Sequence, residues 1–130
     1  MISKFKDLLS YAKEQPDPQR LLFLFAKTEL NNPKKSKKNA KGTITPTMCV
    51  DKLPEELTDY ASLIKEADGI SSDWDFVFIS SLSGGKKQPP TTEDADPYLN
   101  KMTNDITSGQ NIARYVVFDR QDNPIELLPN

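Results

Sequence analysis

The chain has 130 residues, with 17 lysines and arginines against 19 aspartates and glutamates, no histidine and a single cysteine. The absence of histidine excludes Ser-His-Asp and Cys-His catalytic groups, and one cysteine excludes an intrachain disulfide. The length favours a single domain over residues 1–130, and no run approaches the roughly 20 apolar residues that span a bilayer. We therefore expect a cytoplasmic protein with no catalytic residues, no bound metal and no cofactor.

Lysines are concentrated in one segment of the chain. Residues 31–43 hold five lysines and no acid, which leaves 12 basic and 19 acidic residues elsewhere. Such a run of like charges is typical of a solvated loop. A nucleic-acid binder needs a broad basic face, and this run contains no aromatic residue that could stack on bases. The sequence therefore predicts a solvated Lys-rich loop in preference to the alternative, a site for an anionic partner such as RNA, DNA or an acidic protein. We expect neither a nucleic-acid nor a membrane partner.

The first part of the chain predicts one helix and two strands. Apolar residues at helical spacing favour a helix over residues 4–14, with Ser3 as its N-cap. Consecutive apolar residues over 21–26 predict a strand that is buried on both faces, and residues 45–50 predict a second strand. The long join between these strands lacks a helical pattern. We therefore expect the two strands to pair antiparallel.

The stretch 73–83 predicts the central strand of the sheet. Its aromatic residues Trp74, Phe76 and Phe78 would lie on one face, and a strand that is apolar on both faces sits in the middle of a covered sheet. A helix is predicted before it, beginning at Leu53–Pro54 and ending at the C′ glycine 69. The second strand, this helix and the central strand would then form a right-handed parallel crossover.

The last third of the chain predicts a loop, a helix and a hairpin. Residues 83–95 form a Gly/Pro-rich loop, and a third helix begins at Asp96–Pro97 and ends at Gly109. Residues 112–119 predict a fourth strand, and the polar turn before residues 125–128 predicts a terminal hairpin. The fold class is α/β (α+β-like). It consists of a single mixed sheet of four or five strands with three helices, in the order αββαβαββ.

Four core segments carry a resemblance to known proteins: QRLLFLFA at 19–26, MCVDK at 48–52, DWDFVF at 73–78 and FDRQ at 118–121. They resemble a group of small bacterial proteins that are often named "ribonucleotide reductase subunit alpha". The resemblance covers most of the chain, but these motifs are core strands. The reductase of that name is a large radical enzyme that needs several cysteines at its site. Cys49 alone does not provide that site, so we expect no nucleotide reduction.

Polar residues follow three of the predicted strands. If the second, third and fourth strands run parallel, these residues share the carboxyl edge of the sheet, where open α/β sheets bind ligands. They are Asp51, Ser83, Gly84, Gly85, Lys86, Asp119 and Arg120. The Ser-Gly-Gly-Lys sequence matches neither common phosphate-binding glycine motif. The residues therefore indicate either a site for a small polar ligand or caps of strands and helices, with Asp51 capping the second helix.

Cys49 lies inside a predicted strand, and we expect it to be a small buried residue and not a reactive thiol. No other arrangement of residues in the sequence points to catalysis. The leading hypothesis for function is therefore a non-catalytic protein-interaction or regulatory module, whose partner is another protein or a second copy of the chain. The alternative is a small-ligand-binding protein or an enzyme that uses the carboxyl edge of the sheet.

Overall fold

A computed structural model of the chain describes residues 2–30, 42–85 and 87–126. The elements in chain order are α1 (Phe5–Glu14), β1 (Gln19–Leu30), β2 (Gly42–Lys52), α2 (Tyr60–Ile70), β3 (Phe76–Ser83), α3 (Thr92–Ser108) and β4 (Val116–Asp119). Short 3-10 helices, η1 (Pro54–Glu56) and η2 (Ile112–Arg114), precede α2 and β4. The fold is therefore α+β.

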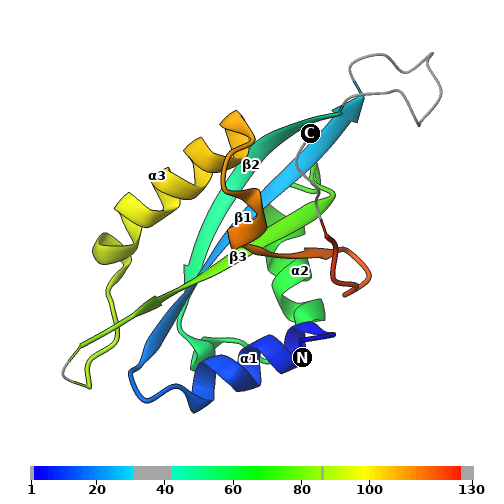
Figure 1. Cartoon of the computed structure of the whole chain (residues 1–130). Coiled ribbons are helices and arrows are strands. Elements are labelled where there is room, and N and C mark those ends of the chain that lie inside the picture. Colours follow the sequence, from blue (N-terminus) through cyan, green and yellow to red (C-terminus); the bar gives the residue numbers. More distant parts are fainter. Residues whose placement is uncertain (1, 31–41, 86, 127–130) are drawn as a thin grey trace.

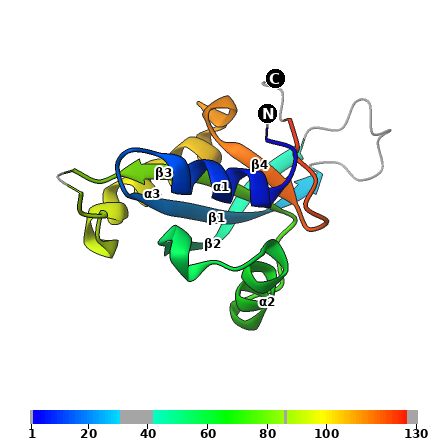
Figure 2. The ribbon, with the colours of Figure 1, turned by 90° about the horizontal axis from the view of Figure 1, so that it is seen from below.

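The four strands form one sheet in the order β2-β1-β3-β4, and every neighbouring pair is antiparallel. The predicted antiparallel pairing of the first two strands is confirmed, but the prediction of a mixed sheet is wrong. β2 and β3 run in the same direction, yet β1 lies between them and pairs with both. Helices α1 and α2 cover one face of the sheet, and α3 covers the other (Figures 1 and 2).

Strand β1 carries the centre of the core, as its run of apolar residues predicts. Its residues Leu21–Ala26 are at most 1% exposed. Because successive side chains alternate between faces, Phe23 and Phe25 pack under α1 and α2, while Leu22 and Leu24 pack under α3. The prediction that this strand is buried on both faces is confirmed.

Trp74 does not share a face with Phe76 and Phe78, so that prediction is wrong. The strand β3 begins after Trp74, and the indole packs edge-on against Phe25 on the α1 and α2 side, with ring centroids 4.9 Å apart. Phe78, in contrast, lies in the cluster under α3. Side chains alternate between the two faces only within a regular strand. The pairing is irregular at Asp75, whose N–H donates to the carbonyl of Ala26, so the alternation does not extend back to Trp74.

The helices begin at other residues than the sequence predicted. The prediction that α2 starts at residues 53–54 is wrong, because η1 intervenes and Asp59 caps the helix through a 2.8 Å hydrogen bond from Ser62 N. Helix α3 starts before the predicted Asp96–Pro97, since Thr91 provides its N-cap. Gly109 ends α3 in the left-handed region (φ 74°), as predicted.

Two predicted caps are also replaced by other residues. Ser3 does not cap α1; its N–H donates instead to the Asp7 carboxylate, 3.0 Å away. Glycine 69 lies inside α2 and does not end it. The Asp7 carboxylate also accepts from Lys4 N at the start of α1, and Ser71 N donates to Ala67 O at the end of α2.

The predicted fourth strand is shorter than residues 112–119, because its first part forms η2. The predicted terminal hairpin is present only as one bridge between Phe118 and Pro124, with a 2.8 Å bond from Ile125 N to Val117 O. Residues 127–128 lie outside the described part of the chain. Most of the predicted Lys-rich loop, residues 31–41, lies outside it too, while residues 42 and 43 belong to β2.

Candidate functional site: the open edge of β3

Strand β3 is paired on both sides along only half of its length. β1 pairs with all of Phe76–Ser83, whereas β4 pairs with Phe76–Ile79 alone. Among the residues that the structure describes, no strand pairs with the outer side of Ser80–Ser83. We call this four-residue segment the open edge. An unpaired strand edge presents backbone N–H and C=O groups that bind another extended chain readily.

The hydrogen-bond alternation shows which peptide groups face outward. Gly84 N donates to Pro18 O over 2.8 Å, at the end of the ladder between β3 and β1. Because the peptide groups of an antiparallel strand bond alternately to its two neighbours, Leu82 faces β1, and the amides of Ser81 and Ser83 face away from it. The open edge therefore presents the backbone groups of these two serines.

The two serine side chains are held in place by Gln19, which is 7% exposed. Ser81 Oγ donates to Gln19 Oε1 over 2.5 Å, and Gln19 Nε2 donates to Ser83 Oγ over 2.8 Å. Both hydroxyls therefore turn toward α1 and leave the outward amides uncovered. The Gln19 side chain also ties the strand to the preceding turn through a bond to Asp17 O. Gln19 therefore connects the side chains of both serines to the turn before β1.

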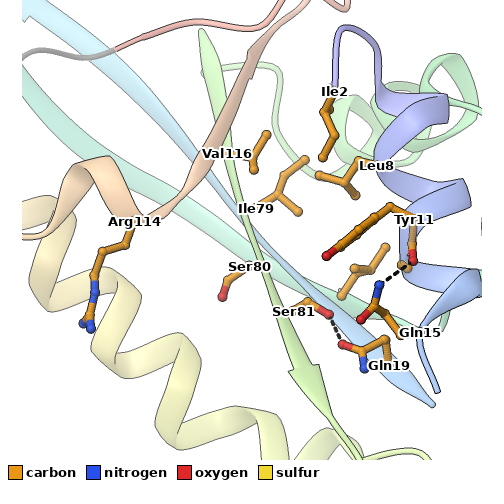
Figure 3. Close-up of a pocket in the computed structure, with 12 residues that line it drawn as sticks. Ile2, Leu8, Tyr11, Gln15, Gln19, Ile79, Ser80, Ser81, Arg114 and Val116 are labelled. Atoms are coloured by element: carbon orange, nitrogen blue, oxygen red, sulfur yellow. Dashed lines mark hydrogen bonds between the residues drawn. The ribbon is translucent and has the colours of Figure 1, made fainter. Parts of the chain in front are cut away.

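Apolar grooves lie on both sides of the open edge. On the α1 side, a groove of about 250 Å³ is lined mainly by apolar side chains, among them Leu8, Tyr11, Ile79 and Val116. Figure 3 shows the Tyr11 ring reaching from α1 toward β3, where Ser80 and Ser81 lie beside it. On the α3 side, a second pocket is lined by Tyr98, Met102 and Tyr115, among others.

Two exposed aromatic rings flank the open edge. Tyr11 is 60% exposed and Tyr98 is 50% exposed, so both are among the few large apolar side chains left in solvent in the described part of the chain. Each lines a pocket that also contains Ser80. Exposed aromatic surface that borders a groove marks an interaction site more often than a single scattered ring does.

The edge is open because the chain before β4 turns away from β3. Residues Ile112–Arg114 coil into η2, and the carboxylate of Asp105 in α3 holds this turn. It accepts hydrogen bonds from Tyr115 OH over 2.5 Å and from Asn111 Nδ2 over 3.3 Å. Lys101 adds an ion pair at 3.0 Å. The buried Asp105 therefore fixes η2 against α3. In this position η2 does not continue β4 along Ser80–Ser83.

These contacts shift the pKa of both Asp105 and Tyr115. The hydrogen bonds from Tyr115 and Lys101 lower the pKa of Asp105 to about 2. Burial, together with the bond to the carboxylate, raises the pKa of Tyr115 to about 12. At neutral pH the pair is thus a carboxylate and a neutral phenol, which is the combination that the hydrogen bond needs.

Arg114 is placed beside the open edge. It lines both the groove under α1 and the pocket under α3, and Figure 3 shows it on the other side of β3 from Tyr11. The side chain is exposed, and within the described residues its guanidinium has no hydrogen-bond or ion-pair partner. A positive charge without an internal partner is available to an anionic group of a ligand.

The other edges of the sheet are protected in the described part of the chain. The outer edge of β2 carries Pro46, and the register with β1 shifts between Phe25 and Ala26. Proline and irregular pairing both prevent another strand from adding. The outer side of β4 is covered by the following turn, where Asp119 N donates to Asn123 O and Ile125 N donates to Val117 O. Ser80–Ser83 lacks both kinds of protection.

The residues of the sequence-predicted site do not come together. Because β4 is antiparallel to β3, Asp119 pairs with Phe76 at the start of β3, at the opposite end from Asp51 and Ser83. The prediction of a shared carboxyl edge is therefore wrong. Asp51 does not cap α2 either; it forms a 2.6 Å ion pair with Arg20 and accepts a bond from Thr92.

Arg120 has a structural partner at that opposite end. Its guanidinium pairs with both carboxylate oxygens of Asp68 at 3.0 and 3.1 Å. It also lies 3.9 Å from the centroid of the Trp74 ring and donates to Trp74 O. These bonds lower the pKa of Asp68. Arg120 thus fastens α2 and Trp74 to the end of β4 and is not free for a ligand.

The glycines that follow β3 build a tight turn. A Cβ added at Gly84 would lie 1.9 Å from Gln88 O, so this position requires glycine. Gly85 pairs with Gln88 in a single bridge, and the returning chain reaches the β1 side, where Arg20 Nε donates to Pro90 O. The returning chain therefore makes its bond on the far side of β3 from the open edge. Lys86 lies outside the described residues.

Cys49 is exposed, so the prediction that it is buried is wrong. Its thiol lies 3.9 Å from Thr103 Oγ1 of α3. Partial desolvation by this helix raises the pKa of the thiol, which disfavours the reactive thiolate.

The sequence singled out Ser83 at the end of the open edge, but as part of a small-ligand site shared with Asp51 and Asp119, and not as an unpaired strand edge. A signal was present: the stretch changes from Phe-Val-Phe-Ile to Ser-Ser-Leu-Ser, and Tyr11 lies off the apolar stripe of its helix. Within the described residues there is no group of histidine, cysteine or acidic side chains that could hold a metal, and no helix is long and apolar enough to cross a membrane. Comparison with protein-family models, with curated proteins and with solved structures gave no match.

Proposed function

We propose that this protein is a non-catalytic interaction module that binds an extended segment of a partner protein along the open edge of β3. The observation that carries the proposal is the pairing of β3, which has a strand on both sides over Phe76–Ile79 and on one side over Ser80–Ser83. An added strand gains main-chain hydrogen bonds at the edge, and side-chain pockets on its two faces give selectivity.

The surroundings of the edge favour a peptide over a compact small molecule. Successive side chains of an added strand point to opposite faces. One set would enter the groove under Tyr11, and the other set would contact Tyr98 and Tyr115 on the α3 side. The groove under α1 is lined mainly by apolar atoms, so we expect apolar side chains in the ligand there.

Proline at Ser81 tests the proposal. Two display libraries of random peptides, one with free carboxyl termini and one with free amino termini, are selected on the wild-type protein. Enriched peptides are synthesised, and their dissociation constants are measured by fluorescence anisotropy. Ser81→Pro removes the outward N–H and places a ring on the edge, whereas Ser81→Ala loses only the bond to Gln19. We expect at least about tenfold weaker binding to Ser81→Pro than to Ser81→Ala.

The fold of these variants is checked by urea denaturation. Because the Ser81 amide faces outward, Ser81→Pro should unfold within about 1 kcal/mol of Ser81→Ala, while Leu82→Pro should lose at least about 2 kcal/mol. Ser83→Pro and Ser83→Ala form a second matched pair for the binding assay. Failure to enrich any peptide, or equal affinity for the proline and alanine variants, would reject the proposal. Dimerisation of the wild type that Ser81→Pro abolishes would identify a second copy as the occupant instead.

A further inference from the structure

We infer that the segment bound at the open edge is the carboxyl-terminal end of the partner, and that Arg114 binds its terminal carboxylate. This inference rests on the proposed function and specifies the ligand of the same site. Three features carry it: the place where β4 begins, the direction that pairing with β3 imposes, and the charge of Arg114.

An added strand on the open edge must end where β4 begins. β4 already occupies the outer side of β3 as far as the pair Ile79 and Val116. A ligand strand alongside Ser81–Ser83 lies in the same line, so it meets Tyr115 and Arg114 at that point. An internal segment of a partner would have to leave the sheet abruptly there. A chain terminus ends there without any further turn.

The direction of pairing decides which terminus lies there. An antiparallel ligand runs from Ser83 toward Ser80, so its carboxyl end points at the start of β4. A parallel ligand would place its positively charged amino terminus at the same point. Antiparallel pairs are slightly more stable per residue, and each neighbouring pair in this sheet is antiparallel. The geometry therefore favours the carboxyl end.

Arg114 supplies the matching charge. Its exposed guanidinium has no hydrogen-bond or ion-pair partner within the described residues, although it stands between two pockets that share Ser80. The Asp105 carboxylate, the acid nearest to η2 in these contacts, is already engaged by Tyr115, Asn111 and Lys101. A guanidinium binds a carboxylate through two parallel hydrogen bonds, which a terminal amide does not reproduce.

The side-chain alternation also predicts the last residue of the ligand. Ser81 faces the α1 side, because its hydroxyl bonds to Gln19, and residues directly opposite each other in a pair share a face. A ligand residue opposite Ser81 would therefore enter the groove lined by Ile79, Val116 and Tyr11. We expect an apolar residue at this terminal position.

The experiment compares each enriched peptide as a free acid and as a carboxyl-terminal amide. Binding is measured to the wild type, to Arg114→Gln and to Arg114→Lys, with Lys65→Gln on α2 as a control for the loss of one exposed positive charge. We expect amidation to weaken binding to the wild type and to Lys65→Gln at least tenfold. Arg114→Gln should bind acid and amide within twofold of each other, and Arg114→Lys should keep part of the difference.

The outcomes separate this inference from the proposed function. Peptides that require an unblocked Ser81 edge but bind equally well as acid and amide would leave the proposed function standing and overturn the carboxylate assignment. A preference for the acid that persists in Arg114→Gln would assign the carboxylate to another group and overturn the role of Arg114. If no peptide binds at Ser81 at all, both proposals fail together.

Discussion

The two halves of β3 differ in their pairing and in their burial. Phe76–Ile79 has strand neighbours on both sides and helices on both faces, and three of its four residues are buried. Ser80–Ser83 continues the same strand but has a neighbour on one side only, and none of its residues is buried. One strand thus contributes to the core at its start and presents an unpaired edge at its end.

The composition of each half matches its surroundings. The buried half is Phe-Val-Phe-Ile, and the exposed half is Ser-Ser-Leu-Ser. Serine fits an edge that has to stay soluble, because its hydroxyl bonds locally, here to Gln19 through Ser81 and Ser83. A strand that is uniformly apolar would aggregate at an unpaired edge. The change from apolar residues to serines therefore coincides with the point where pairing with β4 ends.

The largest expected difference between the halves is in stability. Phe78→Ala removes a fully buried ring and should cost about 3–5 kcal/mol of unfolding free energy. Leu82→Ala removes a half-buried side chain and should cost less than about 1.5 kcal/mol. Urea denaturation of both variants measures the comparison. Equal losses would mean that the end of β3 is part of the core, which would contradict the open edge.

Sequence patterns predicted the strands better than they predicted the neighbours of the strands. The buried runs at 21–26 and 77–79 are core strands, because consecutive apolar residues have to be covered on both faces. No local sequence pattern indicates which other strand a given strand pairs with. β2 and β3 point the same way, as predicted, but β1 lies between them and pairs antiparallel with both.

The same limit explains why the predicted site failed. Asp119 and Arg120 were placed beside Asp51 on the assumption that three strands are parallel, and one reversed strand moves them to the far end of the sheet. Arg114 had no sequence signal that separates it from other exposed arginines. Its proposed role rests on its place in η2, which Asp105 contacts through Tyr115 and Asn111, and no spacing rule connects those residues.

The second expected difference is between two arginines, one at each half of the strand. Arg120 binds Asp68 through two oxygens and stacks on Trp74, so Arg120→Ala should cost about 1–2 kcal/mol. The pair is partly exposed, at 29% and 35% of the two side chains, and solvent screening keeps the cost below that of a buried pair. Arg114→Ala should cost less than about 0.5 kcal/mol.

Thermal and urea denaturation of the two arginine variants give the measurement. Arg120→Lys provides a further control, because a lysine keeps the charge but cannot bind both oxygens of Asp68 in the same way. It should recover only part of the stability. A loss of stability in Arg114→Ala as large as that in Arg120→Ala would show that Arg114 has a structural role, and it would weaken the assignment of Arg114 to a ligand.

The smallest expected effect concerns pH and the turn that keeps the edge open. Hydrogen bonds from Tyr115 and Lys101 lower the Asp105 pKa from its ordinary 3.8 to about 2. A carboxyl group with a lower pKa in the folded protein stabilises the fold above its unfolded pKa, and that contribution is lost as the pH falls from about 4 to about 2. Asp105→Asn has no such group, so its Tm should fall less steeply than that of the wild type over this interval.

Because Asp105 holds η2 and not β3, the variant should keep the core and bind edge peptides more weakly at pH 7. Parallel pH profiles of the two proteins, with unchanged peptide affinity, would show that η2 stays in place without Asp105 and that another contact keeps the edge open.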